Sequence, residues 1–339
     1  MKKQALFSFI LLLSTIISAQ NPLKSDLLYA DQSPLEIKLS YSNKEMDRNT
    51  DDSTFIKTPM QFFHDEKWSS MEVKLRARGN FRRSTCYFPP IKMKIKKDQR
   101  SGTIFDGNKS LKLVLPCKIE SENNDNILQE FIAYKIYEKI SPYHFKTRRV
   151  NVDFDEIRGK KTKNFKLKGF LIEDDKLVAK RHEGKVFERF VHPLGMEHTT
   201  SVQNALFQFL LGNTDFSVAY QHNGKLLYVD KKIIPLPYDF DMTGWVNPSY
   251  ATVNASLGIS SVQDRVYRGF KREQKYFQEV RQQFLDHKME LINLVSSFES
   301  EFSDPKEFKN MFGFMNDFFE ILENDSKFEK RIVAKARTK

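Results

Sequence analysis

The chain has 339 residues, of which 40% are apolar and 13% aromatic, enough for one large or two small packed cores. Its 30 Phe residues, against 13 Gly and 12 Pro, exclude disordered and low-complexity classes and predict a Phe-rich core. The formal charge of +11 is a moderate basic excess, because 44 acidic residues accompany 55 Lys and Arg residues. Aromatic residues do not interleave with the basic ones as a stacking platform requires, so no nucleic-acid partner is expected.

Residues 1–19 have the pattern of a secretory signal peptide. Lys2 and Lys3 precede an apolar run, and Ala19 supplies the small residue at the cleavage point. The apolar run is shorter than the roughly 20 residues that span a bilayer. We therefore expect cleavage after Ala19, no membrane span, and a periplasmic or secreted protein.

Strands are predicted next along the chain. Residues 20–66 are polar and are interpreted as a lead-in segment with one strand at Leu35–Tyr41. Alternating apolar and basic residues then predict an antiparallel meander of three strands, at 71–78, 91–96 and 111–115. If the last two strands pair around a turn near residue 103, Cys86 and Cys117 lie side by side, and we predict a disulfide between them. The alternative is a free buried cysteine.

The pattern then changes from strands to helices. Apolar spacing predicts a helix at 126–140, strands at 148–154 and 165–173, a helix at 199–211, strands at 226–229 and 233–238, and helices after Ser261. This order predicts an α+β fold of two lobes with a cleft between them. The first lobe, residues 67–175, is an antiparallel sheet with one helix, and the second, residues 176–339, is mainly helical.

Two carboxylates, Asp239 and Asp241, directly follow the predicted strand at 233–238. At a strand end both side chains can turn toward one point, and paired carboxylates suit a hard cation such as Mg²⁺ that also binds nucleotide phosphates. The alternative is a surface turn with two solvated acids.

A second acidic position lies upstream, where Asp215 follows the helix at 199–211 and Asn223 opens the next strand. An Asp, then an Asn, then an acidic pair is the order of the catalytic base and the metal ligands in kinases. The alternative is a helix that ends at Gly212-Asn213, with Asp215 in a structural role.

Basic residues in the first half supply the remaining candidate positions. The turn Arg78-Gly79-Asn80 offers backbone N–H groups to phosphates, and Lys94 or Lys112 offers a lysine on the sheet. Glu130 on the predicted helix would hold that lysine, and we predict that Lys112 and Glu130 face each other. The alternative is that these basic side chains form the solvated face of the meander.

Together, Arg78-Gly79-Asn80, the strand at 90–95, the loop from Asp215 to Asn223 and the motif Pro237-Tyr238-Asp239-Phe240-Asp241 resemble the CotH-type atypical kinases, which are related to secretory-pathway kinases. The resemblance spans residues 70–250 and implies a two-lobed kinase-like fold that uses ATP with Mg²⁺ or Mn²⁺. It implies that Asp215 orients or deprotonates the acceptor hydroxyl, that Asn223 and Asp239 hold the metal, and that Asp241 assists. This chain departs from the family in the residues after Asn80, which are Phe and Arg, and in a longer loop before Asn223.

The expected function is that of an exported kinase, which transfers a nucleotide phosphoryl group to a hydroxyl of an extracytoplasmic protein. The alternative is a non-catalytic envelope protein of the same fold that binds an anionic polymer through its basic strands. Metal-dependent nucleotide binding distinguishes the two.

Overall fold

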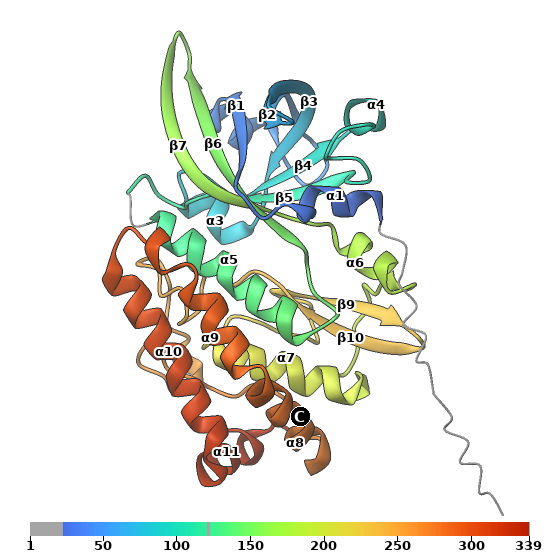
Figure 1. Ribbon diagram of the computed structural model, residues 1–339, viewed down its shortest axis with the longest axis vertical. Helices are drawn as coiled ribbons and strands as arrows, with labels where there is room; N and C mark the ends of the chain where they lie inside the picture. The colour runs from blue at the N-terminus through green and yellow to red at the C-terminus, as the bar shows by residue number, and fades with distance from the viewer. Residues whose placement is uncertain (1–22, 121–122, 339) are drawn as a thin grey trace, which may run out of the picture.

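The computed structural model describes residues 23–120 and 123–338, and seven of its strands close into a barrel (Figure 1). The order around the barrel is β1-β2-β3-β4-β5-β7-β6, and β6 pairs with β1 to close it. That last pair is parallel, with Leu35 opposite Val150, whereas the other neighbours are antiparallel. The strands are β1 (Leu35–Tyr41), β2 (Ile56–His64), β3 (Lys67–Ala77), β4 (Ile91–Ile95), β5 (Ser110–Val114), β6 (Thr147–Arg158) and β7 (Lys161–Ile172).

The predicted two-lobed kinase-like fold with an antiparallel sheet lobe is therefore wrong. The meander of β3, β4 and β5 and the pair of β6 and β7 are confirmed, but they belong to a closed barrel of mixed strand direction. Two of its strands, β1 and β2, come from the 20–66 segment that the sequence presents as a lead-in. Alternation shows which residues face a core but not which strand is the partner, so the parallel pairing of β1 with the distant β6 left no local signal.

Inside the barrel lies one of two hydrophobic cores. On β3, Met71, Val73, Leu75 and Ala77 point inward, and the residues between them point outward. Phe side chains dominate the largest fully buried residues of the described chain, which agrees with the predicted Phe-rich core. Closure removes the free edges that an open sheet would present.

A disulfide joins Cys86 and Cys117, as predicted, with their Cα atoms 4.5 Å apart. The register of β4 and β5 places Ile91 opposite Leu113, so the chain segments just outside this pair also lie side by side. The amide N–H of Tyr87 donates to the carbonyl of Cys117 over 2.7 Å and extends the contact. The bridge ties the end of α3 (Asn80–Thr85) to the exit of β5.

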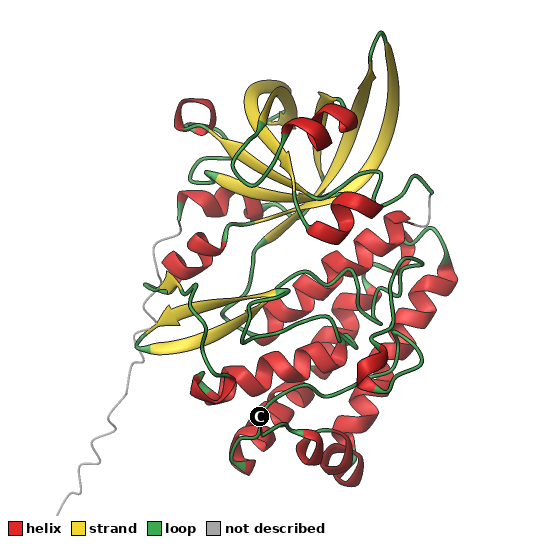
Figure 2. Ribbon diagram, turned by 180° about the vertical axis from the view of Figure 1, so that it is seen from behind, coloured by secondary structure: helices red, strands yellow, loops and turns green. Residues whose placement is uncertain are grey.

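Helices form the other part of the molecule, with α5 lying between them and the barrel (Figure 1). The second hydrophobic core gathers around α5, whose residues from Ile127 to Tyr137 are buried on nearly every side. A small antiparallel sheet of β8 (Lys185–Val186), β9 (Gly224–Val229) and β10 (Lys232–Pro237) lies beside these helices (Figure 2). The other helices are α1 (Leu27–Ala30), α2 (Asn43–Asn49), α4 (Lys97–Arg100), α5 (Asn123–Ile140), α6 (Asp175–Arg181), α7 (His198–Leu210), α8 (Gln274–Asp286), α9 (Lys288–Ser296), α10 (Pro305–Glu323) and α11 (Asp325–Arg331).

The predicted signal peptide, with cleavage after Ala19, lies outside the described residues. Within residues 23–120 and 123–338, no helix combines the length and the apolar character needed to cross a membrane. The predicted helices at 126–140 and 199–211 and the strands at 226–229 and 233–238 are confirmed within one to three residues as α5, α7, β9 and β10.

Candidate functional site

The acidic motif after β10 adopts a tight turn under the barrel. Asp239 has a left-handed backbone with φ of 65°, a conformation that Asp tolerates better than most residues. Its amide N–H donates to the Tyr134 hydroxyl of α5 over 3.0 Å, which fixes the turn against that helix. Strain of this kind persists only where the surroundings enforce it, and it is frequent at functional sites.

The two carboxylates of this turn differ in environment. The Asp239 side chain is 22% exposed, whereas that of Asp241 is 6% exposed. Burial raises the pKa of Asp241 to about 7; nearby Arg82 opposes the rise, and Asp239, to which Asp241 is hydrogen-bonded, adds to it. The buried Asp241 therefore holds its proton more tightly than an exposed Asp would.

Arg82 of α3 lies between two buried acids. Its Nε is 3.4 Å from Asp241 Oδ2, and its Nη1 is 3.8 Å from Glu130 Oε2 on α5. Its Nη2 also donates to the carbonyl of Leu115 over 3.3 Å, next to the disulfide. Burial raises the pKa of Glu130 to about 8, although the Arg82 charge acts in the opposite direction.

Two further cations lie on the barrel side of the turn. Arg78 Nη2 is 3.6 Å from Asp239 Oδ2, and its guanidinium lies 5.1 Å from the centre of the Tyr238 ring. Lys112 of β5 places its ammonium 4.2 Å from the same ring and 4.7 Å from that of Phe145. That ammonium is buried and has no hydrogen-bond partner among the described residues. Burial, assisted by the Arg78 charge, lowers the pKa of Lys112 to about 8.

The loop after α7 brings Asp215 and Asn223 together. Ser217 and His222 form a short bridge that turns the chain back, so the long loop does not separate the two residues. Asn223 Nδ2 donates to Asp215 Oδ2 over 3.0 Å, and His222 Nε2 lies 2.9 Å from Asp215 Oδ1. The Asp215 charge also raises the pKa of Asp241, so this loop lies within electrostatic range of the acidic turn.

The structure thus gathers most of the predicted site residues. They are Arg78, Lys112, Glu130, Asp215, Asn223, Asp239 and Asp241, which come from β5, α5, the segment after β3 and the loops around β9 and β10. Gly79 precedes α3 with φ of 79°, a conformation that favours Gly. The Asn80 side chain lies outside the description. Lys94 lies elsewhere, on the outer barrel face, 4.3 Å from the Phe55 ring.

The predicted contact of Lys112 with Glu130 is not formed, because Arg82 takes that place. Lys112 points from the outer face of β5 toward Phe145, whereas α3 carries Arg82 directly to α5. Sequence reasoning missed Arg82, and also Tyr250, whose pKa is raised by burial beside this cluster. Nothing in the local sequence separates Arg82 from Arg83, which pairs with Asp47 at the surface.

A divalent cation is compatible with this donor set. Asp241 Oδ2 is a buried carboxylate oxygen without a hydrogen bond, 3.4 Å from Arg82 Nε. Asn223 uses its amide nitrogen toward Asp215, which leaves its carbonyl oxygen available. Among the residues that the structure describes, no group of three or more His, Cys, Asp or Glu side chains could hold a metal, so phosphate oxygens would have to complete the shell.

Comparison with known proteins adds no assignment. No protein-family model matches the chain, and no curated protein matches it either. The function is therefore argued from the chemistry of the site.

Proposed function

We propose that this protein is a metal-dependent phosphotransferase, which moves a phosphoryl group from a nucleotide, ATP in the first instance, to a hydroxyl of a protein. The observation that carries the proposal is the buried ammonium of Lys112, which has no hydrogen-bond partner among the described residues and lies beside Arg78 at the acidic turn. Asp175 and Asp174 attract this charge, but neither forms a hydrogen bond or ion pair with it in the described chain, so the ammonium keeps its donors for an anionic ligand.

The charges around Lys112 fit a nucleotide triphosphate. Lys112 and Arg78 would contact phosphate oxygens from the barrel side. Asp239, Asp241 and Asn223 would hold Mg²⁺ or Mn²⁺ from the other side, and the metal would offset the charge of the transferring phosphoryl group. Arg82 keeps Asp241 in place and links it to Glu130 on α5.

Asp215 is the candidate for the acceptor side of the reaction. Its side chain is 48% exposed, so an acceptor hydroxyl can reach it. Its carboxylate is held in place by Asn223 and His222. In the proposed step the hydroxyl oxygen attacks the terminal phosphorus and the bond to the bridging oxygen of the nucleotide diphosphate breaks. The hydroxyl proton passes to Asp215.

The resemblance to CotH-type kinases and the predicted signal peptide support an extracytoplasmic protein as the acceptor. Both are sequence arguments, and the proposal extends them to this site. A protein acceptor outside the cytoplasm requires nucleotide in the same compartment, and the assay below supplies it directly.

The test measures nucleotide binding and phosphoryl transfer separately. With ATP and Mg²⁺ or Mn²⁺, we expect a rise in Tm that is absent without the metal, and transfer of labelled γ-phosphate to casein or to the chain itself. Asp239→Ala should abolish both, whereas Asp215→Asn should keep ATP binding and slow transfer by about two to four orders of magnitude.

Asp230 provides a matched control for these substitutions. It also has a left-handed backbone, with φ of 47°, but lies in the turn between β9 and β10. Asp230→Ala and Asp230→Asn should leave binding and transfer unchanged. Equal loss of ATP binding in Asp239→Ala and Asp215→Asn would contradict the assigned roles, and absence of metal-dependent ATP binding in the wild type would reject the proposal.

A second candidate function rests on the outer face of the barrel, where basic residues oppose one another on adjacent strands. Lys74 faces Lys94, and Arg76 faces Lys92. Like charges in these positions destabilise a sheet. Partial burial and the charge of Lys92 lower the pKa of Lys94. This face favours a non-catalytic protein that binds an anionic polymer, and a salt-sensitive Tm shift with polyphosphate but none with ATP would support that function instead.

A further inference from the structure

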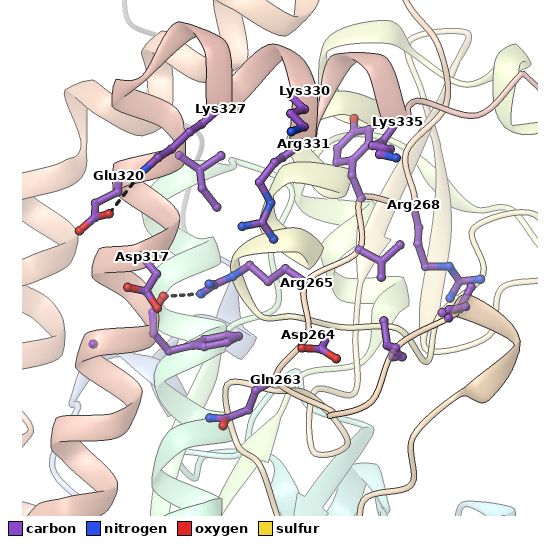
Figure 3. Close-up of a pocket in the computed structure, with 18 of the residues that line it drawn as sticks. Gln263, Asp264, Arg265, Arg268, Asp317, Glu320, Lys327, Lys330, Arg331 and Lys335 are labelled. Carbon is purple, nitrogen blue, oxygen red and sulfur yellow. Dashed lines mark hydrogen bonds and ion pairs between the residues drawn. The ribbon is translucent and has the colours of Figure 1, made fainter.

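A wide groove of about 1600 Å³ runs along the helical part (Figure 3). Its walls are the segment from Leu257 to Arg268, helices α10 and α11, and the chain beyond α11. Eight of its lining residues are Lys or Arg and three are acidic. The groove therefore carries a positive excess that the candidate site does not explain.

The acidic residues of the groove are already engaged. Asp264 accepts hydrogen bonds from the backbone of Ser260 and Ser261, and Glu320 lies 3.5 Å from Lys327. The Asp317 charge raises the pKa of the neighbouring Arg265, against the larger effect of burial. The cations across the groove remain in excess of these acids.

Several cations of the groove have no acidic partner. Lys330, Arg331 and Lys335 make no ion pair within residues 23–120 and 123–338, and Arg331 and Arg265 extend into the same space from two sides (Figure 3). Burial lowers the pKa of Arg265, and the nearby Arg331 charge acts in the same direction. Arg265 already donates to the carbonyls of Leu210 and Phe314. The cations that remain for an anionic ligand are therefore the exposed side chains of Lys330, Arg331 and Lys335.

One lining residue of the groove contacts the loop on the proposed acceptor side of the site. Arg268, which lines the groove, donates to the carbonyl of Thr214, next to Asp215. Its guanidinium lies 5.2 Å from the centre of the Phe216 ring, and the Asp215 charge raises its pKa against the larger effect of burial. Arg268 therefore connects the groove to the loop that carries Asp215.

The groove also has an apolar wall and an unfilled helix face. Leu257, Ile259 and Ile321 line it together with the cations. Gly313 lies within α10, where a Gly weakens a helix, and a Cβ atom placed there would meet no atom within 4 Å. The missing side chain keeps this part of the groove open. A mixed apolar and cationic lining suits a peptide better than a uniformly charged polymer.

From these contacts we infer that the groove binds an acidic segment of the acceptor protein and so directs the phosphorylated hydroxyl to Asp215. The inference rests on the proposed function for its acceptor, but binding to the groove needs neither nucleotide nor transfer. Carboxylates of the segment would pair with Lys330, Arg331 and Lys335, and an apolar residue would contact the wall near Ile321.

The experiment measures binding of a labelled peptide, acetyl-Ser-Glu-Asp-Leu-Glu-Asp-Glu-amide, by fluorescence anisotropy without nucleotide. The same peptide with Gln and Asn in place of the acids, and a single-stranded oligonucleotide of equal charge, serve as comparisons. We expect the acidic peptide to bind more tightly than both. Oligonucleotide binding that is as tight and equally sensitive to the groove variants would overturn the inference.

One double variant in the groove and one matched double variant elsewhere locate the binding site. Lys330→Glu combined with Lys335→Glu should weaken the acidic peptide at least tenfold. Lys44→Glu combined with Arg48→Glu makes the same change of charge on α2 of the barrel and should have little effect. Equal weakening in the two double variants would show general charge attraction and overturn the inference.

Gly313→Met separates blocked binding from misfolding. The substitution places a side chain in the groove and removes a helix-weakening Gly, so it should weaken the peptide while Tm stays level or rises. Unchanged peptide affinity in this variant would overturn the inference. Peptide binding in the groove without any phosphoryl transfer would reject the proposed function alone. If instead phosphoryl transfer occurs and its rate is the same in the wild type and in all groove variants, the inference alone is rejected.

Discussion

Replacing Lys112 with Met should make the protein more stable and weaken its binding of nucleotide. The Lys112 ammonium is buried between the rings of Phe145 and Tyr238, without a hydrogen-bond partner in the described chain. Met keeps the length of the side chain and its contact with the rings but removes the charge. If the lysine served only the fold, its removal would not change ligand binding.

The magnitude follows from the pKa of Lys112. Burial lowers this pKa to about 8 from the ordinary lysine value of 10.5. At pH 7 the unfolded chain binds the proton more tightly than the folded chain, so the buried charge costs about 3 kcal/mol. Met cannot replace the cation–π attraction between the Lys112 ammonium and the two rings, which is worth about 1 kcal/mol. We therefore expect Lys112→Met to raise the free energy of unfolding by about 2 to 3 kcal/mol at pH 7.

The sign of the pH dependence gives an independent check. Between the folded pKa and the unfolded pKa the unfolded chain holds more protons at Lys112, so this group makes wild-type stability increase as pH rises from about 8 to about 10.5. Lys112→Met should lack that increase. Urea unfolding at pH 7 and at pH 9.5, for both proteins, measures the difference.

Lys94→Met is the matched control, because Lys94 lies on the neighbouring strand with its side chain exposed. It should change stability by less than about 0.5 kcal/mol. ATP affinity with Mg²⁺ should fall at least tenfold in Lys112→Met and remain unchanged in Lys94→Met. A Lys112→Met protein that is no more stable than the wild type and binds ATP equally well would refute the reasoning.

Two further predictions concern stability away from the acidic turn. The bridge between Cys86 and Cys117 has a sequence separation of 31 residues, so replacing both with Ser should cost about 3 to 4 kcal/mol in the chain-entropy model. Urea unfolding that is the same with and without reductant would contradict this, as would two free thiols in the unreduced, denatured protein. Burial lowers the pKa of His144 to about 4 from the ordinary histidine value of 6.5, and its Nδ1 lies 2.7 Å from the carbonyl oxygen of Ser141. Between these two pKa values the unfolded chain binds a proton at His144 and the folded chain does not. The free energy of unfolding should therefore fall by about 2 to 3 kcal/mol as pH falls from 6.5 to 4.5. His144→Gln should lose less stability over that interval, and an identical pH dependence in the two proteins would show that His144 does not carry it.

Much of the local structure could be predicted from residue pattern alone. Alternation located β1 and the meander of β3, β4 and β5, because strands with one buried face repeat every second residue. Helical spacing located α5 and α7 in the same way. The antiparallel pairing of β4 and β5 followed from placing a turn near residue 103, midway between them, and with it the pairing of Cys86 with Cys117.

The acidic turn could also be predicted, since Asp239 and Asp241 follow an apolar strand and Asp215 precedes Asn223 along the chain. Position in the sequence did not predict which cation each acid contacts. Arg82 and Arg83 are neighbours with the same chemistry, but only Arg82 points from α3 toward Glu130. That choice depends on the direction of a short helix, which packing against α5 and β5 decides.

By itself, then, the sequence determined which segments form strands and helices and where the acidic residues lie, because those properties depend on neighbours along the chain. The tertiary structure decided the closure of the barrel, through the parallel contact of β1 with β6. It also decided the burial of Lys112 and the pairing of Arg82 with Glu130 and Asp241. These features depend on contacts between distant segments, and the free energies of such contacts leave no periodic trace in the residues that make them.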